Sequence, residues 1–240
     1  MCYETVSNPT HFVAELQHIH PAFIFSTQPT VKRRPIMFSG AQVSLYPMTS
    51  NFVPVILDAV KALDPHREQL RIETDDLSTL LVGPPEILFK AMHDLFVTAA
   101  RSGEHVVLHG TVSRGCPGEP DAEICRPSVV LGERKPTSER ISSAKAVIDS
   151  TAESGQHVSA QFSYYPLGEN KEYMTEIYAA IDFIKNSGVF SKSKNFCTKL
   201  EGDAAKVFGT LGQVFLNFAP EQAHVTLDIT VSANSPSNKK

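Results

Sequence analysis

The chain has 240 residues, of which 42% are apolar and 20% charged, and its formal net charge is −4. This composition excludes a chain that is disordered throughout, and the length allows a core to form without disulfides or a metal. No apolar run reaches the roughly 20 residues that a membrane span requires. The absence of a clustered basic face argues against nucleic acid as a partner.

Four cysteines, Cys2, Cys116, Cys125 and Cys197, have no spacing typical of a metal site or of a disulfide framework. The lack of such spacing is expected of a protein in a reducing compartment. We therefore expect a soluble cytoplasmic protein that does not insert into a membrane and needs neither a metal nor a cofactor.

Residues 1–37 precede the first predicted repeat as an N-terminal extension. An apolar patch in this extension, HFVAELQHIHPAFIF, comes before Lys32, Arg33 and Arg34, which reverses the order found in a secretory signal. Glu4 and Glu15 are unusual for a transit peptide, because such peptides are poor in acidic residues. Two interpretations stay open, a disordered extension and an organellar targeting segment.

An internal repeat organises the rest of the chain. The segment AQVSLYP at 41–47 recurs 119 residues later as AQFSYYP at 160–166. The same offset aligns EHVVLHGTVS at 104–113 with AHVTLDITVS at 223–232. An unchanged offset at both ends of such a long stretch predicts two copies of one module.

The first copy, residues 38–118, has the order strand, helix, strand, strand, helix, strand. Residues 41–47 alternate between two faces and end at Pro47, as expected of a strand. Apolar spacing from residue 52 to residue 63 predicts a helix, and two short strands flank the polar TDD turn. A second helix follows Gly83, and the last strand is expected at 105–113.

The second copy, residues 157–237, repeats this order. The order predicts an α+β fold of tandem ferredoxin-like (βαββαβ) repeats, each an antiparallel four-stranded sheet with two helices on one face. Residues 119–156 are predicted to be an exposed linker with at most a short helix near 142–149. Residues 238–240 form a tail.

Polar residues gather where such a sheet would form a small pocket. In the first copy they are Ser44, Tyr46, Asp75, Ser78, Thr79, Ser113 and Cys116, and in the second copy Ser163, Tyr165, Thr198, Glu201, Ser232 and Asn234. Convergent hydroxyls, an aromatic ring and a carboxylate suit a small polar heterocycle. The alternative is that these are ordinary sheet residues that face solvent.

The same regions carry a resemblance to a known family. The runs SLYPM (44–48), TDDLST (74–79), GTVSRGCPG (110–118), YYPL (164–167), LEGDAAKVF (200–208) and SANSPS (232–237) resemble the YkoF-type proteins that bind thiamin or hydroxymethylpyrimidine. The resemblance covers nearly all of residues 38–237. It implies tandem ferredoxin-like repeats that dimerise and bind thiamin or its pyrimidine precursor in each repeat, in vitamin salvage or buffering and without catalysis.

Given this resemblance, Asp75 is expected to accept a hydrogen bond from the amine of the pyrimidine, and Tyr46 to stack on the ring. In the second copy Lys194 aligns with Asp75, so a carboxylate would have to come from Glu201 or Asp203. We therefore expect two unequal sites, with the first copy the stronger for thiamin.

Two other functions stay open. An enzyme on the same scaffold would use His105 or Cys116, although His105 and its counterpart His224 start a predicted strand, where a structural role is expected. An interaction module would pair its sheets between chains and bind nothing. A four-stranded sheet leaves one face uncovered, so the two sheets are expected to pack together or against a second chain, with a homodimer as the default assembly.

Overall fold

The computed structural model describes residues 34–35, 39–115, 130–131, 135–167, 173–218 and 224–238, all of which belong to one unit of the chain, Arg33–Lys240. Most of the predicted extension, the candidate Cys116 and residues 239–240 lie outside these ranges. In chain order the elements are β1 (Arg34–Pro35), β2 (Ser39–Pro47), α1 (Phe52–Lys61), the 3₁₀ turn η1 (Asp64–His66), β3 (Arg71–Thr74), β4 (Thr79–Val82), α2 (Pro85–Ala100), β5 (Val106–Arg114), β6 (Val130–Leu131), α3 (Thr137–Ser150), β7 (His157–Leu167), α4 (Tyr173–Lys185), β8 (Phe190–Ser193), β9 (Thr198–Asp203), α5 (Ala204–Asn217), β10 (His224–Ala233) and the 3₁₀ turn η3 (Pro236–Asn238).

One eight-stranded sheet contains both repeats, in the order β3-β4-β2-β5-β10-β7-β9-β8. All its neighbouring strands pair antiparallel. The first four strands come from the first copy and the last four from the second, and each set has the strand order of a ferredoxin-like βαββαβ unit. The predicted α+β fold of tandem ferredoxin-like repeats is therefore confirmed. β1 and β6 pair separately as a two-stranded sheet.

The two repeats meet where β5 pairs with β10. In this pair Gly110 lies opposite Ile229, and these positions are equivalent in the repeat because they are 119 residues apart. A local twofold axis that relates the two repeats therefore passes between these residues. A Cβ atom on Gly110 would lie 2.9 Å from Cγ1 of Val43, so glycine provides room for that side chain.

Of the two expected packings of the sheets, together or against a second chain, the first is wrong, because the sheets do not pack face to face within the chain. The last strand of each repeat would be an edge strand, with unpaired backbone groups along its length. Pairing β5 with β10 satisfies both edges and extends the sheet, so the repeats lie edge to edge.

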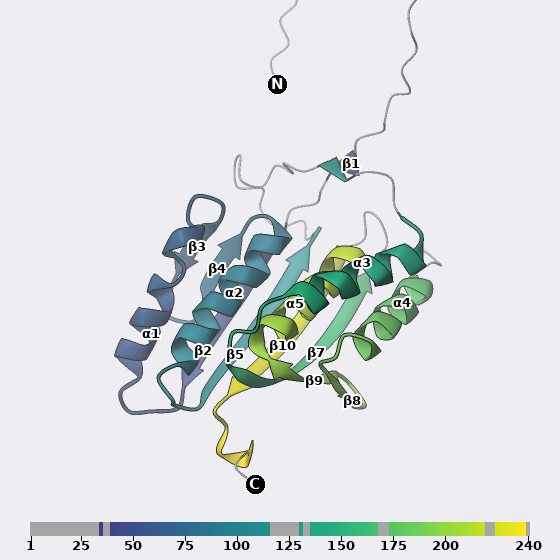
Figure 1. The fold of residues 1–240 in the computed structure, drawn as a ribbon. Helices are drawn as coiled ribbons and strands as arrows, with labels where there is room; N and C mark the ends of the chain where they lie inside the picture. Colours follow the sequence, from purple (N-terminus) through teal and green to yellow (C-terminus); the bar gives the residue numbers. More distant parts are fainter. Residues whose placement is uncertain are drawn as a thin grey trace, which may run out of the picture. The chain divides into compact units, whose positions relative to one another are not determined.

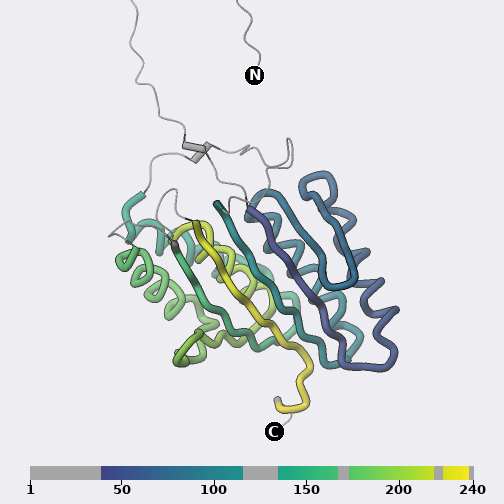
Figure 2. Tube along the Cα trace, turned by 180° about the vertical axis from the view of Figure 1, so that it is seen from behind, coloured from purple at the N-terminus to yellow at the C-terminus, as the bar shows by residue number. Residues whose placement is uncertain are grey.

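Helices α1 to α5 cover one face of this sheet (Figure 1), and seen from behind the strands lie in front of all the helices (Figure 2). The strands have one apolar face for the helices to cover. In β10, for example, buried residues alternate strictly with partly exposed ones along Val225–Ala233. The core lies between sheet and helices, where α2 packs on α5 through Phe89 with Phe215 and Phe96 with Phe208, at ring-centroid distances of 5.7 and 6.0 Å.

Both repeats enter their second helix through the same backbone geometry. Gly83 and Gly202 occupy equivalent positions and have φ angles of +156° and +155°. A Cβ atom on Gly83 would also lie 2.7 Å from the carbonyl oxygen of Gln69. A side chain at this turn would therefore be strained, which explains the glycine in each copy.

The second half of the predicted linker is a packed helix. α3 spans Thr137–Ser150, longer than the short helix expected near 142–149, and contacts α4 and α5. It buries Arg140, Ala144 and Ile148. Arg140 makes two hydrogen bonds to the carboxylate of Glu176 on α4, at 2.8 and 3.0 Å, and its guanidinium lies 5.6 Å from the ring centroid of Phe218. The prediction of an exposed linker is thus wrong for this half.

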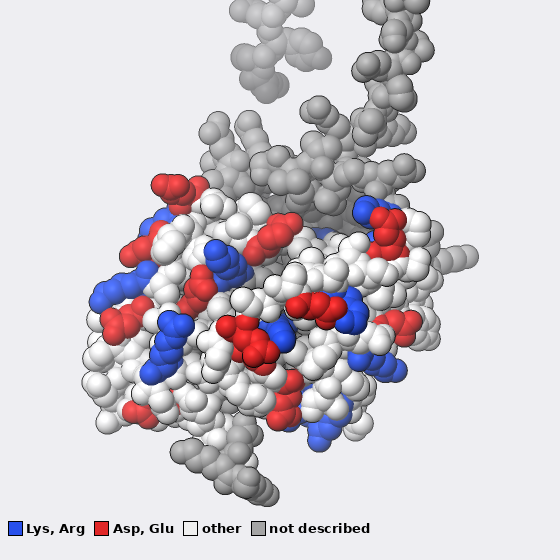
Figure 3. Space-filling view, viewed as in Figure 1, with Lys and Arg blue, Asp and Glu red and all other residues white. Residues whose placement is uncertain are grey.

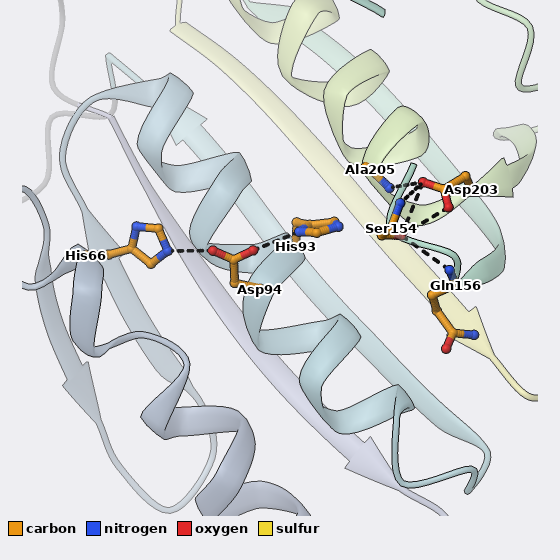
Figure 4. A network of polar contacts seen from close by, with 7 residues as sticks. All are labelled: His66, His93, Asp94, Ser154, Gln156, Asp203 and Ala205. Carbon is orange, nitrogen blue, oxygen red and sulfur yellow. Dashed lines mark hydrogen bonds and ion pairs between the residues drawn. The ribbon is translucent and has the colours of Figure 1, made fainter. Parts of the chain in front are cut away.

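Two carboxylates in the helix layer have structural partners (Figure 4). Asp94 on α2 accepts from His66 at 2.8 Å and from His93 at 2.9 Å. Asp203 caps α5, since it accepts from the backbone N–H of Ala205 at 2.9 Å and of Ser154 at 3.0 Å.

On the helix-covered face, acidic and basic side chains are interspersed (Figure 3). Lys61 pairs with Asp58 and Lys145 with Asp149 in this layer. Exposed pairs of this kind contribute little to stability. Among the helices in the described ranges, none has the length and apolar character needed to cross a membrane.

Candidate functional site

The uncovered face of the sheet is polar. Strand residues alternate between the two faces, so the residues next to the buried ones on the four central strands point to this face, which Figure 2 shows uncovered by helices. They include Gln42, Ser44 and Tyr46 of β2, His109, Thr111 and Ser113 of β5, Gln161, Ser163 and Tyr165 of β7, and Thr226, Asp228, Thr230 and Ser232 of β10.

In the first copy, the turn between β3 and β4 lies against β2 on this face. Ser44 Oγ donates to the carbonyl oxygen of Leu77 at 2.9 Å, and the amide of Gln42 donates to Ser78 Oγ. Leu77 is 78% exposed and Tyr46 51% exposed. We call Gln42, Ser44, Tyr46, Leu77 and Ser78 the repeat-1 site.

The second copy repeats this arrangement. Ser163 Oγ donates to the carbonyl oxygen of Phe196 at 2.8 Å, and the side chain of Cys197 contacts Oε1 of Gln161 at 3.8 Å. Phe196 is 90% exposed and Tyr165 50%. We call Gln161, Ser163, Tyr165, Phe196 and Cys197 the repeat-2 site. Each member lies 119 residues after its counterpart.

The exposed side chains of Leu77 and Phe196 are notable at these positions. Large apolar side chains that stand almost free of the surface, beside polar groups that converge, are typical of contact sites for a ligand or a partner. Their recurrence in both copies indicates a duplicated site.

The carboxylate of Asp75 has a structural role in its turn. Its Oδ1 accepts from the backbone N–H groups of Leu77, at 2.9 Å, and of Ser78, at 2.8 Å. These two bonds hold the pKa of Asp75 below its usual value. Lys194, its counterpart, instead donates through Nζ to Oε1 of Gln161 at 3.1 Å. The two turns therefore bring opposite charges to the outer side of the two sites.

Three candidate residues lie away from these sites. Thr79 is 6% exposed, faces the helices and contacts Thr74 at 3.0 Å. Thr198 pairs with the buried Phe162 and so has the same orientation. Glu201 does lie on the open face, but it pairs with Ser159, four residues before Ser163 on β7. Lys199 donates to Glu201 at 2.7 Å, which lowers the pKa of this carboxyl.

Three further candidates hold the repeats together. Ser113 contacts His224 at 2.9 Å, and Ser232 contacts His105 at 3.0 Å. These are the same contact made twice, because serines and histidines are equivalent between the copies. Asn234, at a φ of 56°, donates to the carbonyl oxygens of Ala100 and Glu104. We call the two His–Ser contacts the seam.

The candidates from the sequence did not include Gln42 and Leu77 or their counterparts Gln161 and Phe196. They also lacked two residues at the centre of the open face. His109 lies opposite Ser44 on the neighbouring strand, and Asp228 lies opposite Ser163. The signal was present, because the alignment of residues 104–113 with 223–232 sets His109 against Asp228. It could not be interpreted without the register, which shows that each residue borders a site.

The side chains of this face are suited to binding a ligand through hydrogen bonds and stacking. Each site offers a hydroxyl, a carboxamide and a half-exposed aromatic ring, which together suit a small, flat, polar molecule. Within the described ranges, no group of three or more His, Cys, Asp or Glu residues is arranged to hold a metal ion.

The fold and the duplicated site define a tandem ferredoxin-like repeat protein with one candidate site in each repeat. The sequence model of the YKOF-related family matches residues 38–119 and 157–238, so the chain belongs to this family. The chain is also 34% identical, over 201 residues, to a Bacillus subtilis (strain 168) protein named "Putative HMP/thiamine-binding protein YkoF". The aligned region covers 84% of this chain and 92% of the relative. The resemblance expected from the sequence is confirmed.

Proposed function

We propose that the chain binds thiamin or its hydroxymethylpyrimidine precursor on the open face of the sheet, with one site in each repeat, and that it acts as a cytoplasmic, non-catalytic protein of vitamin salvage or buffering. The observation that carries this proposal is the recurrence of the same hydroxyl, carboxamide and aromatic arrangement in both repeats. The name of the Bacillus subtilis relative supports the choice of ligand.

The donors and acceptors of the repeat-1 site match those of an aminopyrimidine. The ring nitrogens accept hydrogen bonds and the exocyclic amine donates them. The hydroxyl of Ser78 and the carboxamide of Gln42 each provide a donor and an acceptor. Tyr46 offers a half-exposed ring for stacking, and a positively charged thiazolium ring over it would gain about 0.5–2 kcal/mol.

The repeat-2 site has the same frame with different chemistry. Ser163 and Tyr165 keep their places, while Cys197 replaces the hydroxyl of Ser78 with a weaker donor. Oε1 of Gln161 accepts from Lys194, so this carboxamide has its NH₂ group left to donate to a ligand. We therefore retain the expectation that the two sites differ in affinity.

Isothermal titration calorimetry tests the proposal directly. The full chain is titrated with thiamin and with hydroxymethylpyrimidine, beside Tyr46→Ala and Tyr165→Ala. Each variant is expected to weaken one site about tenfold, since removal of a stacked aromatic ring costs about 1–3 kcal/mol per base. The matched control is Tyr178→Ala, because Tyr178 is 60% exposed on α4, in the helix layer. Absence of binding by the wild type, or equal loss in the control, would contradict the proposal.

The enzyme alternative depends on His105 and Cys116. The ring of His105 is bonded to Ser232 in the seam, and this supports a structural rather than a catalytic role. Incubation of thiamin with the wild type is expected to leave the vitamin intact by chromatography. Turnover that disappears in His105→Ala or Cys116→Ser would overturn the non-catalytic role.

A further inference from the structure

The open face carries one asymmetry at its centre. His109 on β5 and Asp228 on β10 occupy equivalent positions, 119 residues apart, but they differ in charge and in chemistry. Each lies opposite the serine of its own site, Ser44 for His109 and Ser163 for Asp228. Side chains that face each other across an antiparallel pair have Cβ atoms about 4.5–5.5 Å apart. A ligand bound at either serine therefore meets one of these two residues.

Both side chains are accessible to a ligand. His109 is 47% and Asp228 49% exposed at the side chain, and Nε2 of His109 lies 3.7 Å from Oδ2 of Asp228. Nδ1 of His109 also contacts Thr230 Oγ1 at 3.4 Å. The imidazole thus points toward β10, and the carboxylate of Asp228 has no other hydrogen bond or ion pair at closer range among the described residues.

Of the other described carboxylates near the two sites, Asp75 belongs to the turn of the repeat-1 site, and those of the second repeat have partners of their own. Asp75 accepts two backbone bonds in its turn, and Asp203 caps α5. Glu201 pairs with Lys199 and lies four residues along the sheet from the level of Ser163, about 13 Å at the rise of a strand. Among the described residues, Asp228 is therefore the carboxylate placed to meet a ligand of the repeat-2 site.

We infer that Asp228 is the specificity-determining residue of the repeat-2 site, and that it makes this site prefer a ligand with a permanently charged cationic ring over a neutral one. This inference rests on the proposed function. Thiamin carries such a charge in its thiazolium ring, whereas hydroxymethylpyrimidine has no thiazolium. At the equivalent strand position His109 gives the repeat-1 site no anion, and the carboxylate beside that site is Asp75 in its turn.

The test compares thiamin with hydroxymethylpyrimidine by calorimetry in one buffer. In Asp228→Asn the affinity for thiamin at one of the two sites falls about fivefold, the factor for one unit charge at 4 Å in water, while the affinity for hydroxymethylpyrimidine is unchanged. The converse variant, His109→Asp, gives the repeat-1 site a carboxylate and raises its affinity for thiamin by a similar factor. Glu201→Gln removes a charge of the same sign from the same face and changes neither affinity.

The outcomes separate this inference from the proposed function. If the wild type binds both ligands and Asp228→Asn lowers both affinities equally, or neither, Asp228 does not select charge and the inference fails alone. The same holds if Glu201→Gln lowers thiamin affinity as much as Asp228→Asn, because the effect would then come from the general field of the face. If the wild type binds neither ligand, the proposed function fails and the inference fails with it.

Discussion

The two histidines of the seam illustrate what a single side chain does in this molecule. His105 directly precedes β5 and His224 is the first residue of β10, and each reaches across the junction of the repeats to a serine near the end of the other repeat's last strand. Recurrence of a histidine in both copies suggests catalysis at first sight. In the structure each histidine instead has a serine partner that recurs with it. A role in stabilising the junction of the repeats therefore explains why the histidine recurs.

A double-mutant cycle measures the free energy that one contact of the seam contributes to stability. His105→Ala, Ser232→Ala and the double variant are compared by urea unfolding. We expect a coupling free energy of about 0.5–1.5 kcal/mol, the net value of one hydrogen bond in a folded protein. A coupling near zero would show that this contact contributes nothing to the junction.

Asp94 connects a single residue to the pH dependence of stability. Partial burial acts to raise its pKa, but the bonds from His93 and His66 outweigh burial and the pKa is lowered from 3.8. A carboxyl with a lowered folded pKa stabilises the fold above its unfolded pKa, and this stability is lost as pH falls from there through the folded pKa.

We therefore expect the wild type to lose stability as pH falls below about 3.8. In Asp94→Asn this position has no charge to lose. The stability of the variant should therefore be lower at neutral pH and fall less steeply as the pH decreases. Thermal unfolding followed by circular dichroism between neutral and strongly acidic pH gives both curves. Parallel curves for the two proteins would show that Asp94 has no part in the acid sensitivity.

At the scale of elements, α3 is joined to the helix layer by a buried ion pair. Arg140 and Glu176 have side chains only 8% and 7% exposed, and together they join α3 to α4. Removal of Arg140 takes two hydrogen bonds from the buried carboxylate of Glu176, and breaking a buried ion pair in this way is strongly destabilising. This explains how a helix with a narrow apolar face can be held in the layer.

Arg140→Ala is expected to lower the free energy of unfolding by about 3–5 kcal/mol, whereas the apolar replacement Arg140→Met with Glu176→Leu should cost much less. Chemical denaturation of both variants measures this difference. Lys145→Ala, which breaks the exposed pair with Asp149 on the same helix, is the control and should have little effect. Equal losses in the single and double variants would contradict the proposed role of the buried charge.

The same element shows where prediction from sequence ended. The strands and amphipathic helices of the repeats follow from period and offset, because their apolar residues recur at regular intervals. The residues that α3 buries are an arginine, an alanine and an isoleucine. Because only the alanine and the isoleucine of these are apolar, the sequence of α3 has the polar pattern typical of a solvent-exposed segment. Its packing depends on Glu176, which lies 36 residues away, and local composition does not reveal such a partner.

For the whole molecule, strand pairing decides which candidate residues meet. Ser44, Tyr46, Ser163 and Tyr165 could be placed on one face by alternation alone. Asp228 could not be assigned to a site, because only the β10–β7 register sets it beside Ser163. Conversely, Ser113 and Ser232 satisfied the same polar pattern but contact histidines across the junction.

The open face also bears on the assembly, and the homodimer stays a prediction. The apolar side chains of Leu77 and Phe196 stand 78% and 90% exposed, and a second copy would cover them together with bound ligand. Light scattering of the full chain is expected to give twice the mass of one chain. Leu77→Asp with Phe196→Asp should shift the mass toward a monomer, and Val147→Asp, at an exposed position of α3, should not. A monomeric wild type would exclude this dimer.

The most direct test of the account is the number of ligand molecules bound per chain. Native mass spectrometry of the full chain with hydroxymethylpyrimidine should show two bound molecules, one for each repeat. Tyr46→Ala or Tyr165→Ala alone should favour one bound molecule, and the double variant should favour none. A wild type that binds no ligand, or a double variant that still binds two, would contradict a duplicated site on the open face of the sheet.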